Sequence, residues 1–220
     1  MPTILTEKHA LSPWAKGGIG LGAGFVVLVL IGLLFPTAAA FFPLVSLWCS
    51  CVLFYGCLWV LRAAGVELDF FHRAVLVACW AGMVLYFYWA LGRRQFIYAW
   101  DYVNYIQKQF DTEAAFALGP LAGLRYILST FSEDYTNFIT LFTEFPFCLT
   151  AKTGDSYAFA QVFCILPSLM LMLAGLTTKI GQMLNVKNKF WYSLIGFSWV
   201  LTYPFLRMSA LLAQPDWFGL

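Results

Sequence analysis

Long apolar stretches dominate this sequence, and several of them run for about 20 residues without a charge. A lipid bilayer offers no hydrogen-bond partners to backbone N–H and C=O groups, so a chain crosses it as helices that pair these groups internally. The composition agrees, because 61% of the residues are hydrophobic and only 11% are charged. The sequence therefore predicts an all-α fold, a polytopic bundle of transmembrane helices.

The apolar stretches divide the chain into three parts. Five spans are predicted, at residues 17–35, 37–61, 74–91, 157–176 and 190–206. Residues 1–92 then hold three transmembrane helices, residues 93–156 form a long loop, and residues 157–220 hold two further helices and a tail.

The basic residues orient these spans, because cytoplasmic loops carry an excess of Lys and Arg. With a cytoplasmic N-terminus, the inside segments hold seven basic and three acidic residues: Lys8, Lys16, Arg62, Arg73, Lys179, Lys187 and Lys189 against Glu7, Glu67 and Asp69. The other eight acidic residues fall outside. We therefore predict that the long loop and the C-terminal tail are extracytoplasmic.

The long loop carries two helical patterns. Apolar residues recur at spacings of three and four over residues 103–114, and again from Leu121 to Phe142 after a start at Gly119-Pro120. Pro146 is expected to end the second pattern. We predict amphipathic juxtamembrane helices at residues 102–116 and 120–142, with their apolar sides toward the membrane or the bundle.

An acidic residue in an aromatic cluster follows the third span, in the sequence Trp100-Asp101-Tyr102-Val103-Asn104-Tyr105. On a helix Asp101 and Tyr105 share a face. A carboxylate beside aromatic rings at the edge of a bilayer tends to have a raised pKa, which suits a general base near neutral pH. An aromatic belt with one solvated acid would give the same pattern.

Further polar residues recur in the predicted second loop helix. Arg125, Ser129, Glu133 and Asn137 are spaced four apart and form one row. Either this row is a solvated face, or Glu133 or Asp134 lines a cavity and positions a hydroxyl-bearing or cationic ligand. Arginine matches phosphate oxygens, so Arg125 and Arg207, near the end of the fifth span, are candidate phosphate partners. The cysteines and histidines form no metal-site pattern, and no cofactor is predicted.

This layout resembles the polytopic glycosyltransferases of the GT-C type, which include protein O-mannosyltransferases and the aminoarabinose transferase of lipid A. The resemblance covers residues 74–220 and rests on Asp101 in its aromatic cluster, on Asp134-Tyr135-Thr136-Asn137 and on Pro215-Asp216 with Gly219. It implies a catalytic base at Asp101, substrate contacts from Tyr105, Arg125, Glu133, Asp134, Asn137 and Arg207, and a bacterial inner membrane location. Two paired spans before the third, and the short chain, depart from the family pattern. The apolar ending Trp217-Phe218-Gly219-Leu220 predicts either a fragment or a naturally truncated relative of a longer protein.

Two functions follow as expectations. The first is an inverting transfer of a sugar from a polyprenyl-phosphate donor, held by the membrane lipid, to an acceptor hydroxyl at the outer face. The second is a non-catalytic membrane subunit, scaffold or transporter fragment whose outside loop binds a partner. Nucleic acid is not expected as a partner in either case: the net charge of +2 gives no indication of it, and the basic residues serve to orient the chain in the membrane.

Overall fold

The computed structural model describes residues 12–35, 40–66, 68, 70–93, 101–133, 136–186 and 195. Helices make up most of these residues, and none of the described residues lies in a strand. Four helices are long and apolar enough to cross a membrane: Trp14–Leu34, Phe41–Ala63, Phe70–Leu91 and Gly154–Met183. The prediction of an all-α membrane protein is confirmed at this level. The predicted fifth span, residues 190–206, falls outside the described residues.

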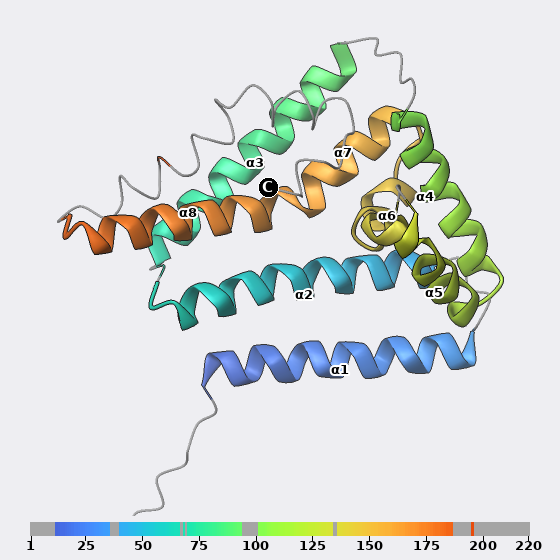
Figure 1. Cartoon of the computed structure of the whole chain (residues 1–220), viewed down its shortest axis with the longest axis horizontal. Coiled ribbons are helices and arrows are strands. Elements are labelled where there is room, and N and C mark those ends of the chain that lie inside the picture. The colour runs from blue at the N-terminus through green and yellow to red at the C-terminus, as the bar shows by residue number, and fades with distance from the viewer. Residues whose placement is uncertain are drawn as a thin grey trace, which may run out of the picture.

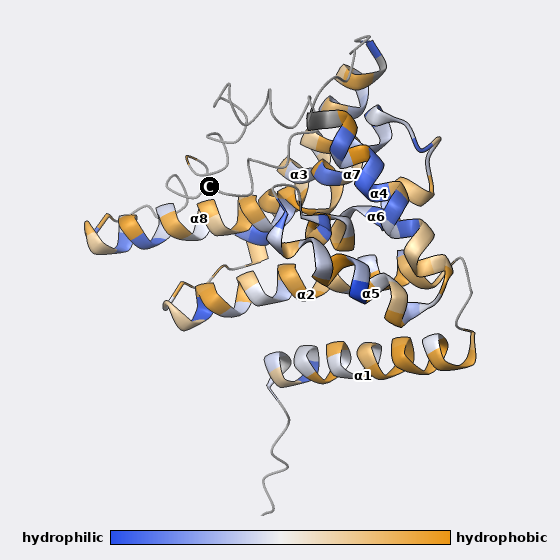
Figure 2. Cartoon of the chain, turned by 45° about the vertical axis from the view of Figure 1, so that its right-hand side comes forward, coloured by the Kyte–Doolittle hydropathy of each residue, from blue (hydrophilic) through white to orange (hydrophobic). Residues whose placement is uncertain are grey.

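Helices α1 (Pro13–Leu34) and α2 (Phe41–Ala63) form an antiparallel pair (Figure 1). Two long-range hydrogen bonds join them: Trp48 Nε1 donates to the carbonyl of Leu21 at 3.0 Å, and the Tyr55 hydroxyl donates to the carbonyl of Trp14 at 2.5 Å. Donors on the second helix therefore fix its register against the first. Hydrophobic residues cover α1 along most of its length (Figure 2).

Helix α3 (Phe70–Arg93) packs against a span that is broken into two helices, α7 (Gly154–Cys164) and α8 (Leu166–Met183). The break at Ile165 has a local cause, because Pro167 lacks an N–H group and occupies the first turn of the second helix. Close packing joins α8 to α2, where the Leu61 side chain occupies the space that a side chain at Gly175 would need. These helices enclose the main hydrophobic core.

Three helices of the predicted loop gather at one end of the apolar helices (Figure 1): α4 (Asp101–Ala117), α5 (Pro120–Ser129) and α6 (Thr140–Cys148). We call these three helices the loop cap. The end of the molecule where they lie is the loop end, and the opposite end is the far end. Gly119, with a φ of 131°, makes the turn between α4 and α5. Few residues other than glycine adopt such a φ.

The structure differs from the prediction of one continuous helix over residues 120–142. Helix α5 ends at Ser129, and two short 3-10 helices, Thr130–Ser132 and Asn137–Ile139, precede α6. The Thr130 hydroxyl donates to the carbonyl of Ile127 and accepts from the backbone N–H of Asn137, at 2.8 and 2.9 Å. Threonine side chains that bond to the backbone compete in this way with helical hydrogen bonds.

Pro146 lies inside α6 and does not end the helix, contrary to the prediction. A proline at this position leaves the carbonyl of Phe142, four residues earlier, without its helical donor. The Ser50 hydroxyl of α2 donates to this carbonyl at 3.3 Å, and the N–H of Phe145 donates to the Ser46 hydroxyl at 3.0 Å. Two serines of a membrane-spanning helix therefore anchor the loop cap to the bundle.

Candidate functional site

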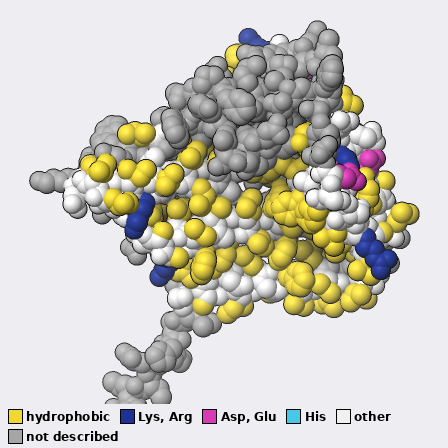
Figure 3. Space-filling view, viewed as in Figure 1, with side chains coloured by type: hydrophobic (Ala, Val, Ile, Leu, Met, Phe, Trp, Pro, Cys, Tyr) yellow, Lys and Arg dark blue, Asp and Glu magenta, His cyan; other side chains and the backbone are white. Residues whose placement is uncertain are grey.

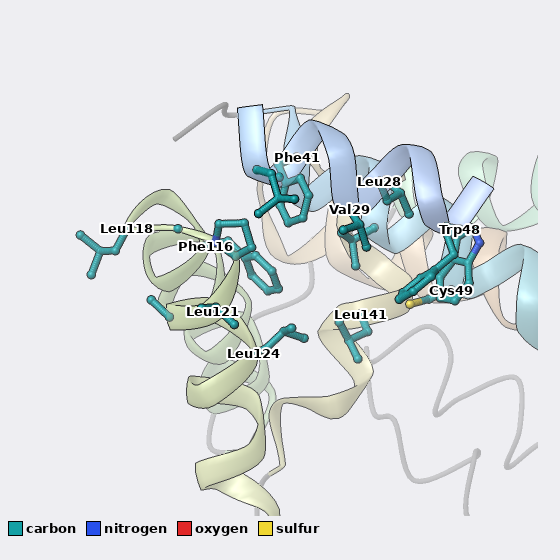
Figure 4. Close-up of a pocket in the computed structure, with 17 residues that line it drawn as sticks. Leu28, Val29, Phe41, Trp48, Cys49, Phe116, Leu118, Leu121, Leu124 and Leu141 are labelled. Carbon is teal, nitrogen blue, oxygen red and sulfur yellow. The ribbon is translucent and has the colours of Figure 1, made fainter. Parts of the chain in front are cut away.

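An apolar groove runs between α1, α2 and the loop cap (Figure 4). Its volume is about 690 Å³, which is typical of sites for small molecules. Each neighbouring helix contributes large apolar side chains, among them Leu28, Val29, Phe41, Trp48, Leu121 and Leu124. On the face of the molecule seen in Figure 3, hydrophobic side chains spread over the spans and charged ones lie near both ends.

The spacing of residues along α1 explains one wall of this groove. Phe25, Leu28, Val29, Gly32 and Leu33 all line it and recur at intervals of three and four, so they share one face of the helix. The face stays partly open, since Leu33 is 73% exposed. The groove therefore has an apolar lining and an opening along a helix that can cross a membrane.

A buried polar cluster lies inside the loop cap, where α4 meets α6. Glu144 is 1% exposed and accepts a hydrogen bond from Gln109 Nε2 at 2.5 Å. The Thr143 hydroxyl donates to Gln109 Oε1 at 2.6 Å. Buried polar groups cost free energy unless they are paired, so this cluster ties the two helices together in one arrangement.

A second set of polar contacts continues along α4. Asn137 Nδ2 donates to the Thr112 hydroxyl at 3.0 Å, and that hydroxyl donates to the carbonyl of Lys108 at 2.7 Å. Asn137 and Thr112 are both fully buried. The 3-10 segment before α6 is therefore held against α4 by side chains rather than by backbone pairing.

Glu144 lies in an environment that favours its neutral form. The pKa of its carboxyl group is raised to about 7. Burial is the main cause and the nearby carboxylate of Glu113 adds to it, while the Gln109 hydrogen bond and Lys152 act in the opposite direction. Glu113 forms an ion pair with Lys152 beside the cluster. The loop cap therefore contains one acid that changes its charge near neutral pH.

A second cleft, of about 610 Å³, opens at the loop end between α3 and α7. Its lining combines the aromatic side chains of Tyr88 and Trp89 with the charged groups of Arg93 and Asp155. The Arg93 guanidinium stacks over the Trp89 ring, with its Cζ atom 4.8 Å from the ring centroid. We call this the interfacial cleft, because it lies at the end of α3, a helix that is long and apolar enough to cross a membrane. In the sequence, Asp101 follows eight residues after the end of this helix.

Comparisons of the chain with protein-family models, with curated proteins and with solved structures find no match. The function is therefore argued from the chain's own residues. No group of three or more metal-binding side chains occurs among the residues that the structure describes.

The predicted site residues lie in different surroundings. Asp101 is the first residue of α4, and its side chain is outside the described part of the structure, as are Asp134 and Arg207. Tyr105 is half-buried against the main core, and Arg125 is exposed on α5.

The row of polar residues predicted on the second loop helix is not present as one helical face. Glu133 has an extended backbone after the first 3-10 helix and forms an ion pair with Lys108 of α4. Asn137 is buried, so it cannot continue an exposed face with Arg125 and Ser129. The predicted row is therefore interrupted, and the ion pair of Glu133 joins α4 to the break after α5.

Sequence reasoning missed Glu144 and Gln109. A signal for Glu144 was present, because this acid stands between Thr143 and Phe145 in an otherwise apolar segment. An isolated acid in such a segment needs a partner, since burying an unpaired charge is costly. Gln109 carried no comparable signal, because it belongs to a helix whose other face is polar and exposed.

Proposed function

We propose that the chain transfers a sugar from a polyprenyl-phosphate donor to an acceptor hydroxyl at the outer face of the membrane, with inversion at the anomeric carbon. The donor stays in the bilayer through its hydrocarbon chain, and the acceptor arrives from the aqueous side. The family resemblance of the sequence motivates the reaction, and the architecture supports it.

The position of α4 is the observation that carries this proposal. This helix begins at Asp101 and packs, with α5 and α6, at the loop end of the apolar helices (Figure 1); its opposite end contributes Phe116 to the apolar groove. A base at this position works at the boundary between lipid and water, where a lipid-linked donor and a soluble acceptor can meet.

The charges of the described residues support the orientation. The far end carries Lys16, Arg62, Arg73 and Lys179, which lie near the ends of four different helices. Lys179 donates to the carbonyl of Ala64 at 2.6 Å, so α8 and α2 meet there. The loop end carries the described acids Asp111, Glu113, Glu133, Glu144 and Asp155. An excess of positive charge at the far end favours a cytoplasmic location for that end.

The proposed reaction follows a single displacement. Asp101 takes the proton of the acceptor hydroxyl as its oxygen attacks the anomeric carbon from the side opposite the phosphate. A carbon–oxygen bond to the acceptor forms, and the bond between the anomeric carbon and the phosphate oxygen breaks. Polyprenyl phosphate leaves with the bonding electrons, and an arginine, Arg125 or Arg207, stabilises its charge.

The substitution Asp101→Asn tests this proposal. It keeps the size of the side chain and removes the base, so we expect turnover to fall by about two to four orders of magnitude, the usual contribution of general base catalysis. The measurement is sugar transfer by the purified protein from an undecaprenyl-phosphate sugar, with expression levels matched.

Asp111→Asn is the matched control. Asp111 belongs to the same helix, and its two oxygens accept hydrogen bonds from Gln107 at 2.8 Å and from Tyr126 at 3.4 Å. The single asparagine oxygen can still accept the shorter bond from Gln107. We expect this variant to retain the parent's activity. Equal activity of Asp101→Asn and the parent would remove Asp101 from the mechanism.

A non-catalytic subunit or scaffold is the second candidate. Exposed apolar side chains of the loop cap favour it. Leu118 and Leu121 are 82% and 70% exposed, and a partner protein that binds there would bury them. This candidate predicts that Asp101→Asn leaves all cellular phenotypes unchanged, whereas Leu121→Asp abolishes the capture of a partner.

A further inference from the structure

We infer that the interfacial cleft binds the head group of phosphatidylethanolamine, a phospholipid with a primary amine. Arg93 pairs with the phosphate of this head group, and Asp155 pairs with its ammonium group. The inference concerns a bound lipid that no reaction consumes, so it stands apart from the proposed sugar transfer and from the apolar groove.

The cleft lies at the depth where lipid head groups are found. The end of α3 and the start of α7 meet at the loop end (Figure 1), and the part of α3 that can cross a membrane ends at Leu91. Tyr88 and Trp89 line the cleft and are 70% and 54% exposed. Exposed aromatic rings of this kind are typical of the boundary between hydrocarbon and water. The cleft is therefore open to the head groups of the surrounding lipid.

Arg93 gives the α3 side of the cleft a positive charge. Its guanidinium group stacks over the Trp89 ring, with its Cζ atom 4.8 Å from the ring centroid, so the ring covers one face of the group. The N–H donors of a guanidinium group point outward in its plane, and stacking leaves them able to bind a phosphate. Arg93 is exposed and forms no ion pair with any residue that the structure describes. An anionic group in the cleft therefore meets a cation that the Trp89 ring holds in place.

The α7 side of the cleft offers acceptors. Asp155 is half-buried in the first turn of α7 and lines the cleft together with Thr150. The Thr150 hydroxyl donates to the carbonyl of Phe147 at 2.8 Å, so its oxygen can only accept a further hydrogen bond. Lys152 and Glu113 form an ion pair with each other and do not line the cleft. A carboxylate and a hydroxyl oxygen that accept hydrogen bonds match an ammonium group, which carries only donors.

These two sides select among the common phospholipid head groups. The head group of phosphatidylglycerol pairs with Arg93 but brings no cation to Asp155, which repels its negative charge. The quaternary ammonium group of phosphatidylcholine has no N–H donors, so it forms no hydrogen bond with Asp155 or Thr150. Phosphatidylethanolamine joins a phosphate to a primary ammonium group through a short linker, so it satisfies both sides of the cleft.

The outer face of α3 continues from the cleft along the path of an acyl chain. Leu85 lies one helical turn before Trp89 on the same side of the helix and is 69% exposed. Val77 lies on the same side about two turns earlier and is 57% exposed. An acyl chain along these residues reaches the hydrocarbon region while its head group stays in the cleft. This arrangement favours a lipid over a soluble phosphate ester.

Arg93→Gln tests the phosphate contact. The full chain in detergent is titrated with phosphatidylethanolamine, phosphatidylglycerol and phosphatidylcholine, and binding is followed by native mass spectrometry. We expect the parent to bind phosphatidylethanolamine about 10-fold more tightly than the other two lipids. Arg93→Gln should lose about 10-fold in affinity for phosphatidylethanolamine, which corresponds to roughly 1.4 kcal/mol.

Arg62→Gln is the matched control for this substitution. Arg62 also stacks over a tryptophan, with its Cζ atom 5.0 Å from the centroid of the Trp14 ring, but it lies at the far end. This variant should bind phosphatidylethanolamine like the parent.

Asp155→Asn tests the ammonium contact through selectivity. Asparagine keeps the size of the side chain and removes its charge, so the affinity for phosphatidylethanolamine should fall by about 10-fold while the affinity for phosphatidylglycerol stays equal or rises. A cleft that merely loses its shape would bind both lipids less tightly. Asp111→Asn removes an acid of α4 that does not line the cleft, and it should keep the parent's preference.

Soluble phosphoethanolamine separates a lipid from a free head group, because it lacks the acyl chains. It should displace phosphatidylethanolamine only at a concentration at least about 100-fold higher. Displacement at equal concentration would overturn the lipid as the occupant of the cleft.

The remaining outcomes decide the inference independently of sugar transfer. Equal affinity of the parent for all three lipids overturns it, and so does tight binding of phosphatidylethanolamine by either Arg93→Gln or Asp155→Asn. An equal loss of phosphatidylethanolamine and phosphatidylglycerol in Asp155→Asn overturns the ammonium contact. A preference for phosphatidylethanolamine that both substitutions abolish supports the inference, whatever the activity of Asp101→Asn.

Discussion

At the scale of single residues, Glu144 is the described acid whose carboxyl group is buried in the protein, at 1% exposed. Its carboxyl group is almost inaccessible to water, and its hydrogen-bond partner Gln109 is a neutral amide. An ionised carboxylate in such a place lacks full compensation for lost hydration. A proton on Glu144 removes this cost, which explains why burial is the main cause of its raised pKa.

The folded protein should therefore be most stable when Glu144 is protonated. Its carboxyl binds a proton more tightly in the folded state, where the pKa is about 7, than in the unfolded chain, where the reference value is 4.5. The contribution of Glu144 to the free energy of unfolding is then complete below about pH 4.5. It declines as the pH rises to about 7, by an amount on the order of 3 kcal/mol. Melting temperatures in detergent, measured across this range, should fall accordingly.

Glu144→Gln should remove this pH dependence and melt at a higher temperature than the parent above pH 7, because glutamine carries no charge to bury. Glu133→Gln is the control, since Glu133 is exposed and pairs with Lys108; this variant should keep the parent's pH dependence. An unchanged slope in Glu144→Gln would show that another group causes it.

At the scale of the elements, the break between α5 and α6 shapes the loop cap. The break turns the chain so that α6 packs against α2, while α5 stays beside α1 and lines the apolar groove. A continuous helix over the same residues could not reach both places. The threonine and asparagine side chains around Thr130 stabilise this turn.

Thr130→Val should destabilise the loop cap. Valine keeps the shape of the side chain but leaves the buried N–H of Asn137 without its acceptor, which costs about 1–3 kcal/mol. Ser129→Ala, at the exposed neighbouring position, should have little effect. The measurement is the free energy of unfolding in mixed detergent and denaturant. A loss of equal size in both variants would contradict the role of the Thr130 hydroxyl.

At the scale of the whole molecule, the two ends differ in their charged residues. The described part of the far end carries basic residues, and the loop end carries acids paired with bases, such as Glu113 with Lys152. This distribution favours an outer location for the loop cap. The apolar helix α1 contributes little to the core, since none of its most apolar 18-residue window is buried. Its outer face is therefore suited to contact with lipid.

A cysteine-labelling experiment tests the orientation. In a variant whose native cysteines are replaced, Ser132→Cys in the loop cap should react with a membrane-impermeant maleimide in intact cells. Ala64→Cys, exposed at the far end, should react only after the membrane is permeabilised. The reverse pattern would place the loop cap in the cytoplasm and contradict the proposed orientation.

The sequence alone determined the class of this protein, because uncharged apolar stretches have only one way to satisfy their backbone in a bilayer. It also predicted where the turn at Gly119-Pro120 lies, since both residues have strong local preferences. Periodicity failed after Ser129, where the apolar residues Phe131 and Phe138 keep helical spacing although α5 has ended and α6 has not begun. Spacing reports which residues are apolar and does not report hydrogen bonds from side chains to a distant backbone.

Only the tertiary structure brought Gln109, Thr143 and Glu144 together, and only it placed α5 across the end of α1 to form the apolar groove. These contacts join residues that are more than 30 positions apart, such as Gln109 and Glu144, which are separated by 35. Local preferences act over a few residues, whereas such contacts depend on how complete helices pack. Burial then changes the chemistry, because the same carboxyl group that would ionise freely in water keeps its proton to near neutral pH inside the loop cap.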